Sequence, residues 1–141
     1  MRPMAVDDMV ESLARLALFA DLPHPQLEAL AHGYDEQVFA PGTRVLREGI
    51  SGSGFYVILD GTAVVSLGGA ERRLGRGEFF GEISVLTEDV PSADVLAETE
   101  LRCLVVPGAE LEQLLLAHPR LMLRLLQAEA RRVRDARQWS S

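Results

Sequence analysis

The chain has 141 residues, 48% of them hydrophobic, one cysteine and a net charge of −7. This size and composition fit one domain, 1–141, with a buried apolar core, and a lone cysteine excludes a disulfide framework. No apolar run reaches the roughly 20 residues of a membrane-spanning helix and no leader sequence opens the chain, so a cytoplasmic protein without membrane contact is expected.

The negative charge is unevenly distributed along the chain. Residues 1–119 contain 8 arginines and 19 acidic residues, whereas residues 120–141 contain 6 arginines and 2 acidic residues. The acidic body should repel nucleic acid, so no nucleic-acid partner is expected. The basic C-terminal segment can contact an acidic surface of this domain or of a partner, or present a solvated helix face.

Two N-terminal helices are predicted in residues 1–33. Apolar residues recur at near-helical spacing within residues 5–18, and acidic residues come early, where the helix dipole favours negative charge. A shorter helix is predicted for residues 25–32, because Pro25 suits a first helical turn and Gly33 ends the pattern.

Residues 34–106 carry the pattern of an antiparallel β-roll or jelly roll. Short β-rich runs are separated by turns, most of which contain glycine, and this even spacing argues against a parallel α/β sheet. Cys103 lies in the last run and is expected to be a buried apolar residue rather than a reactive thiol. The predicted strands are 34–39, 44–46, 55–59, 62–67, 72–74, 93–97 and 101–106.

Two C-terminal helices are predicted in residues 108–139, which gives a mainly β fold with flanking helices. The first covers residues 110–117 and the second, much longer, covers residues 119–139. The long helix begins with apolar residues on nearly every side, so one contact with the β-roll cannot cover them all. A homodimer through this helix is therefore predicted. The apolar residues are Leu121, Met122, Leu123, Leu125 and Leu126.

The segment 75–95 contains the residues that indicate a ligand site. Gly75 and Gly77 bracket a tight turn, and Gly81 frees the backbone where a short helical turn begins at Glu82. Backbone N–H groups at a helix start are unpaired and favour a phosphate or a carboxylate. This segment is therefore predicted to form an anion cradle.

The same segment resembles the phosphate-binding cassette of the cyclic nucleotide-binding domain family. The order of elements is also similar to that of the Crp/Fnr-like sensor domain, over about residues 12–138, and 41–49 and 55–61 look like the family's glycine-marked strands. The resemblance implies a regulatory module that is not an enzyme, binds cyclic AMP or another nucleotide, and needs no other cofactor and no metal. The residues that carry it are Phe80-Gly81-Glu82-Ile83-Ser84-Val85-Leu86 and Pro91-Ser92-Ala93-Asp94-Val95.

In this family, backbone amides, an arginine and a serine or threonine hold the cyclic phosphate, while a glutamate binds the ribose 2′-hydroxyl. The resemblance makes Glu82 the ribose acceptor, although an acid there also stabilises the start of its own helix. Gly81 permits close backbone approach, and Ser92 helps to cap the phosphate. The ligand-binding residues implied in this way are Phe80, Gly81, Glu82, Ile83, Ser84, Ser92 and Ala93.

One position departs from the family pattern, because Pro91 occupies the place of the phosphate-binding arginine. Proline supplies neither a charge nor a backbone donor, and the sequence has no arginine or lysine between Arg76 and Arg102. Asp94 adds a negative charge close by. Losing one charge-assisted hydrogen bond of about 1.5 to 3 kcal/mol weakens binding by about ten- to hundredfold. Weak or altered nucleotide binding is therefore expected.

Two compensations are conceivable, an arginine from the closing helix or a less anionic ligand. Arg124 and Arg131 are the candidate arginines. Trp139 is a candidate to stack on the base, as an aromatic residue does in some family members, or else is a loosely held terminal side chain. The alternative is a degenerate domain that binds no ligand and acts in dimerisation or partner binding.

Two other classes of protein share parts of this pattern. A metal-dependent jelly-roll enzyme requires converging histidine and carboxylate ligands, but His24, His32 and His118 lie beside prolines or at helix ends. A Crp/Fnr-type transcription factor requires a helix-turn-helix after the long helix. The sequence ends at Ser141, so DNA binding is not expected.

Overall fold

The structure, a computed structural model, describes residues 4–49, 54–89 and 91–139, with side chains as far as 136. The helices in these ranges are α1 (Val6–Ala14), η1 (Ala17–Phe19), α2 (His24–Gly33), α3 (Glu82–Leu86), α4 (Gly108–Ala117) and α5 (Pro119–Trp139). The strands are β1 (Asp35–Phe39), β2 (Arg44–Leu46), β3 (Gly54–Asp60), β4 (Ala63–Leu67), β5 (Ala70–Leu74), β6 (Phe79–Phe80), β7 (Asp94–Ala97) and β8 (Leu101–Pro107). The predicted mainly β fold with flanking helices is confirmed.

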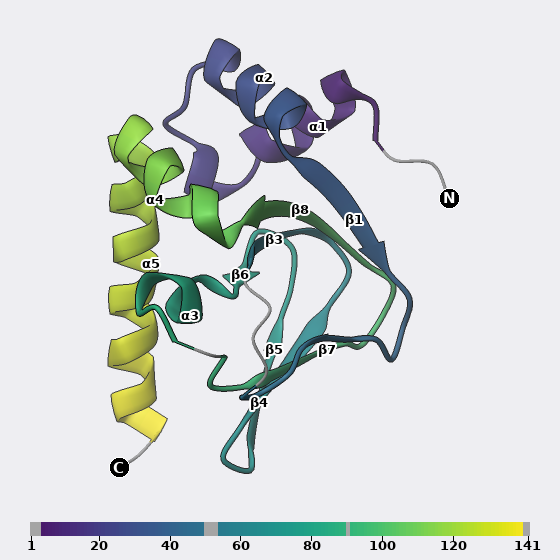
Figure 1. Cartoon of the computed structure of the whole chain (residues 1–141), viewed down its shortest axis with the longest axis vertical. Coiled ribbons are helices and arrows are strands. Elements are labelled where there is room, and N and C mark those ends of the chain that lie inside the picture. Colours follow the sequence, from purple (N-terminus) through teal and green to yellow (C-terminus); the bar gives the residue numbers. More distant parts are fainter. Residues whose placement is uncertain (1–3, 50–53, 90, 140–141) are drawn as a thin grey trace.

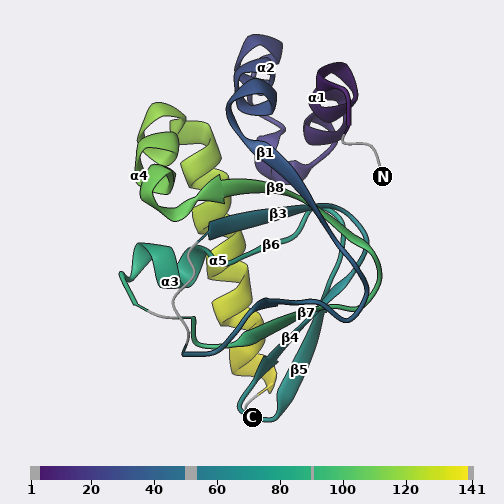
Figure 2. The same cartoon turned by 45° about the vertical axis from the view of Figure 1, so that its right-hand side comes forward.

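The strands form two antiparallel sheets that together make the β-roll. One sheet has the order β1-β8-β3-β6 and the other the order β2-β7-β4-β5. Helices α1 and α2 lie at one end of the roll, and α5 runs along its side (Figure 1). The second view shows that α3 also lies on the α5 side of the roll (Figure 2). Strand β6 was not predicted, because two residues are too few to show an alternating pattern.

Strands β3 and β8 separate two apolar cores, since alternate side chains of a strand face opposite sides of a sheet. Phe55 and Val57 pack toward the helices, whereas Ile58 packs between the two sheets. Cys103 also lies between the sheets and is fully buried, as predicted. Burial raises the pKa of its thiol to about 12, so the thiol stays protonated at neutral pH.

The first predicted helix is broken in two. Helix α1 ends at Ala14, and η1 follows after the extended backbone of Leu16. One straight helix would turn Leu16, Leu18 and Phe19 toward different sides, whereas the break buries all three. The remaining predicted helices are present with ends within two residues of those expected.

Helix α5 is attached to the rest of the chain by its inward face. Leu121 and Leu125 are buried, and Arg124 pairs with Asp21, with Nε–Oδ2 2.8 Å and Nη2–Oδ1 3.1 Å. The Arg124 guanidinium lowers the pKa of Asp21 to about 2. No helix among the described residues is long and apolar enough to cross a membrane.

The outer face of α5 carries apolar side chains that the described residues leave exposed. Met122 is 39% exposed, and Leu126 and Val133 are each 63% exposed. At 100° per residue these three positions lie on one stripe, well away from the face of Leu121 and Leu125. The expectation that one contact cannot cover the apolar start of this helix is confirmed.

Candidate functional site

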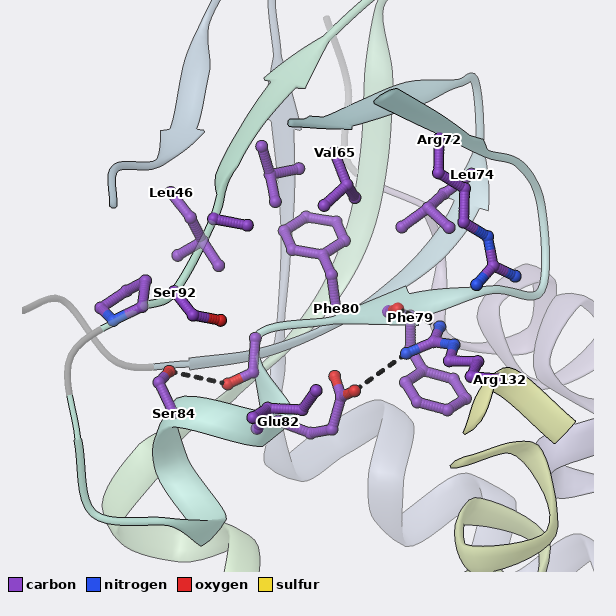
Figure 3. Close-up of a pocket in the computed structure, with 15 residues that line it drawn as sticks. Leu46, Val65, Arg72, Leu74, Phe79, Phe80, Glu82, Ser84, Ser92 and Arg132 are labelled. Carbon is purple, nitrogen blue, oxygen red and sulfur yellow. Dashed lines mark hydrogen bonds and ion pairs between the residues drawn. The ribbon is translucent and has the colours of Figure 1, made fainter. Parts of the chain in front are cut away.

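A cavity of about 140 Å³ lies between the β-roll and α5, with α3 on one side (Figure 3). The structure brings each of the seven ligand-binding residues implied by the family resemblance into its lining, together with apolar residues from the strands and two arginines. Their role in binding a ligand stays a prediction. The cassette residues in the lining are Phe80, Gly81, Glu82, Ile83, Ser84, Ser92 and Ala93.

The two aromatic residues of β6 fix the backbone that leads into the cassette. Phe80 stacks on Tyr56 in the core between the sheets, with ring centroids 4.9 Å apart. Phe79 points the other way and meets Phe55 edge-on at 5.5 Å in the core beneath the helices. Because neighbouring side chains are anchored in different cores, the strand cannot slide or rotate without losing one of them.

Gly81 turns the chain from β6 into α3. Its φ of +90° is in the left-handed region, and a Cβ there would lie 2.1 Å from the carbonyl oxygen of Gly54. Glycine is therefore required by the neighbouring strand whether or not a ligand binds. The hydroxyl of Ser84 donates to the Gly81 carbonyl at 3.2 Å and holds the first turn of α3 in place.

Glu82 is the buried polar centre of the cavity. Its side chain is 1% exposed, and Oε1 accepts a hydrogen bond from Nη1 of Arg132 at 2.9 Å. Oε2 has no hydrogen-bond partner, and no other buried side-chain oxygen or nitrogen of the described residues shares that condition. An orphaned buried oxygen is costly, so this atom is a candidate contact for a ligand.

Arg132 of α5 closes the cavity from the helix side. Its Nη2 donates to the carbonyl of Phe79 at 2.6 Å, and its guanidinium lies 4.2 Å from the centre of the Phe79 ring. Nη1 also donates to Glu129 at 3.2 Å, so the same guanidinium is hydrogen-bonded to the carboxyl groups of Glu82 and Glu129. These contacts attach α5 directly to the cassette.

The ionisation of Glu82 is set by burial. Burial, and then the Glu129 carboxylate, raise the pKa of Glu82 to about 8, while Arg132 acts in the opposite direction. The Glu82 carboxyl is therefore protonated over a wider pH range than a free glutamate. In its protonated form it can offer a proton to an acceptor as well as accept a bond from a hydroxyl.

The helix arginines proposed from the sequence lie elsewhere. Arg124 and Arg131 line a neighbouring cavity of about 250 Å³, and Arg124 is paired with Asp21. The helix residue in the main cavity is Arg132, which follows buried Leu125 by seven residues and so lies on the same helix face. This seven-residue spacing is the sequence feature from which the inward position of Arg132 could have been predicted. The side chain of Trp139 lies outside the described residues, so its stacking role stays a prediction.

A second arginine, Arg72, reaches the cavity from β5. It lies in register with Val65 of β4, which also lines the cavity, and its Nη2 is 3.5 Å from Oε1 of Glu78. Arg72 lies outside the cassette in the sequence, and strand pairing rather than sequence proximity brings it to the site. Figure 3 shows Arg72 and Arg132 on one side of the cavity and Ser84 and Ser92 on the other, with Glu82 between them.

The cassette end of the cavity is closed by Pro91, which is buried. Its carbonyl accepts the backbone N–H of Gly49 at 2.9 Å, so this turn is held by the β2 side of the roll. The sequence suggested that Asp94 adds charge to the site, but its Oδ1 instead accepts the N–H of Glu48 at 2.7 Å. Asp94 is not part of the lining, because that backbone donor draws its carboxylate away.

The histidines offer no metal centre in the described part of the chain. No group of three or more histidine, cysteine or acidic residues lies close enough there to hold an ion. His24 pairs with Glu28 at 2.9 Å, one helical turn away, and Nδ1 of His118 lies 3.1 Å from Oε1 of Gln26. Both contacts are those of structural surface histidines.

Comparison with known sequences assigns the chain to a family. Residues 36–118 match the model of the cyclic nucleotide-binding domain. The chain is 30% identical over 119 residues to a cGMP-dependent protein kinase of Toxoplasma gondii. The aligned region covers 84% of this chain but only 12% of the kinase. The chain thus corresponds to a small part of that relative.

Comparison with solved structures gives the same fold. The N-terminal domain of a transcriptional regulator from Streptomyces coelicolor A3(2) has a TM-score of 0.63 and 32% identity, with 89% of this chain and 94% of that domain covered. The regulatory subunit of a cAMP-independent protein kinase A from Trypanosoma brucei has a TM-score of 0.76 and 24% identity, with 89% and 47% covered. A triple variant of the latter, in which one substitution introduces an arginine, is described as bound to cAMP.

Proposed function

Because the chain belongs to the cyclic nucleotide-binding domain family, we propose that residues 1–141 form a sensor module whose ligand occupies the cavity between the β-roll and α5. Domains of this family are regulatory and non-catalytic, so the proposal assigns no chemical step to the chain. We also propose a cytoplasmic location, because the sequence has a single cysteine and no long apolar run.

One observation carries the proposal. Oε2 of Glu82 is buried and without a partner at the centre of a cavity whose other wall is formed by α5. A ligand hydroxyl placed against this oxygen would satisfy it, and would at the same time contact the residue that Arg132 uses to attach α5. Occupancy of the cavity and the position of α5 are thereby linked through a single side chain.

Cyclic nucleotides are expected to bind weakly. Pro91 replaces the cation that would face the cyclic phosphate, and Arg72 and Arg132 lie at the other side of the cavity. The same fold occurs in the regulatory subunit of a kinase described as cAMP-independent, so the fold alone does not imply regulation by cAMP. A variant of that subunit with three substitutions, one of which introduces an arginine, is described as bound to cAMP, which is compatible with a role for a cation in the cassette.

The proposal is tested by calorimetry with cAMP and cGMP on the wild-type chain. We expect dissociation constants weaker than roughly ten micromolar, because one charge-assisted bond is missing. Glu82→Gln should abolish the residual binding, and Glu112→Gln, an exposed acid on α4, should leave it unchanged. Nanomolar binding by the wild-type chain would show that the loss of the cassette arginine has been repaired.

A second candidate function is assembly through α5. Met122, Leu126 and Val133 form an exposed apolar stripe along the helix, with exposed Ala130 between the last two. Their three- and four-residue spacing suits packing against an identical helix across a two-fold axis. A homodimer is compatible with a sensor, and it would remain as the function of the module if the cavity proved empty of any ligand.

A further inference from the structure

The cassette end of the cavity has no cation among its lining residues in the described part of the chain. Pro91 is buried there and provides no N–H group, and its neighbours in the lining include Leu46 and Ala93. A phosphate pressed against these groups would lose its hydration without gaining a counter-charge, which is strongly unfavourable. This end of the cavity therefore favours an uncharged group.

The two arginines of the lining have their charges already offset. Arg132 contacts Glu129 at 3.2 Å, and Arg72 faces Glu78 at 3.5 Å. The phosphate of a ligand would have to displace these carboxylates, or lie beside them and be repelled. The site as a whole does not supply a free positive charge.

The unmet hydrogen bond in the cavity requires a donor or a neutral acceptor. Oε2 of Glu82 lies at the centre of the site, and the walls on either side include Val65, Phe80 and Val95. Apolar walls with a few fixed polar atoms are typical of pockets for flat heterocycles. At about 140 Å³ the cavity is below the roughly 300 to 1,000 Å³ of most ligand pockets, which favours a small ligand.

We propose that the cavity binds an uncharged nucleoside, with a ribose hydroxyl on Oε2 of Glu82 and the base between the apolar walls. This inference rests on the proposed sensor function and specifies its ligand class. The ribose supplies the hydroxyl donors that Glu82 lacks, and the absence of a phosphate removes the group for which Pro91 provides no partner.

The test is a matched set of ligands titrated into the wild-type chain by calorimetry at pH 7. Adenosine and guanosine are each compared with their 5′-monophosphates and their 3′,5′-cyclic monophosphates. The nucleoside should bind at least about tenfold more tightly than either phosphorylated form of the same base. Its affinity should also change by less than about twofold between roughly 50 and 300 mM salt, because no exposed ion pair forms.

The role of Glu82 is tested with both the ligand and the protein. 2′,3′-Dideoxyadenosine keeps the base and loses both hydroxyls, so its binding should be about tenfold or more weaker than that of adenosine. Glu82→Gln should weaken adenosine by a similar factor, with circular dichroism to verify that the variant is folded. Equal binding of adenosine and its dideoxy form would overturn the assignment even if the variant failed to fold.

The remaining outcomes separate this inference from the function on which it rests. Tighter binding of a cyclic monophosphate than of its nucleoside would overturn the uncharged-ligand inference and leave the sensor proposal standing. Tighter binding of a 5′-monophosphate would also overturn it, and would assign Arg72 and Arg132 to the phosphate. Binding of none of the six ligands would overturn both proposals and leave assembly through α5.

Discussion

Glu82 combines two roles that are usually assigned to separate residues. Its buried carboxyl attaches α5 to the cassette through Arg132, and we propose that its second oxygen, which has no hydrogen-bond partner, contacts a ligand. The sequence predicted that Glu82 would be either a ligand contact or an acid at the start of its helix. The structure adds the contact with Arg132, which follows from the packing of α5 and cannot be read from residues 75–95 alone.

The raised pKa of Glu82 predicts how stability depends on pH. The pKa of Glu82 is about 8 in the folded state and 4.5 for the free side chain. The contribution of Glu82 to the free energy of unfolding is therefore fully present below about pH 4.5. It is lost as pH rises toward 8, because deprotonation places a negative charge in a buried site. The free energy of unfolding of the wild type should therefore fall between pH 5 and pH 8.

Glu82→Gln should make that decline shallower, as measured by urea denaturation across the same pH range. Glu112→Gln on the exposed face of α4 is the control and should follow the wild-type profile. Parallel profiles for Glu82→Gln and wild type would mean that Glu82 is ionised throughout, with Arg132 outweighing burial and Glu129.

Gly81 gives a second prediction at this scale. A Cβ at position 81 would meet the Gly54 carbonyl at 2.1 Å in a backbone with φ of +90°. Gly81→Ala should therefore lower the free energy of unfolding by about 2 kcal/mol or more. Gly75→Ala, with nothing within 4 Å of its Cβ, should change it by less than about 1 kcal/mol. Equal effects of the two substitutions would refute a special requirement at Gly81.

Among the elements, α5 shows most clearly what a sequence pattern can and cannot predict. Its extent and its excess of apolar residues followed from periodicity, because a helix of 21 residues repeats the signal over several turns. Which arginine faces the cavity did not follow, since that depends on how the helix is rotated against the roll. The buried positions Leu121 and Leu125 set this rotation, and it brings Arg132 rather than Arg131 inward.

The apolar stripe on α5 predicts that the protein is dimeric. Leu126→Glu would place a charge at the middle of the stripe, so the main species in analytical ultracentrifugation should change from dimer to monomer. Leu67→Glu, at an equally exposed leucine at the end of β4, should leave the dimer intact. A wild-type chain that remains monomeric at high micromolar concentration would exclude this interface.

At the scale of the whole molecule, the site forms where segments distant in the sequence meet. The cassette provides Glu82, β5 provides Arg72 and α5 provides Arg132. Glycine spacing and the family resemblance located the cassette, since these are local signals. The two arginines were missed because their approach depends on the β4–β5 register and on the docking of α5, neither of which is encoded in a short motif.

The organisation of the cavity explains why one residue should decide its ligand. The turn at Pro91 and the Gly81 corner are held by contacts within the roll, so the backbone there does not depend on a cation at position 91. Restoring a charge at position 91 should therefore restore affinity for a cyclic phosphate without rebuilding the site.

The most direct measurement is calorimetric titration of cAMP into Pro91→Arg and into the wild-type chain. The arginine should tighten binding by about ten- to hundredfold, whereas Leu86→Arg, which adds the same charge to an exposed position of α3 outside the cavity, should not. If Pro91→Arg bound cAMP no more tightly than the wild type, or if the wild type already bound it at nanomolar concentration, the missing cation would not be what determines the ligand of this domain.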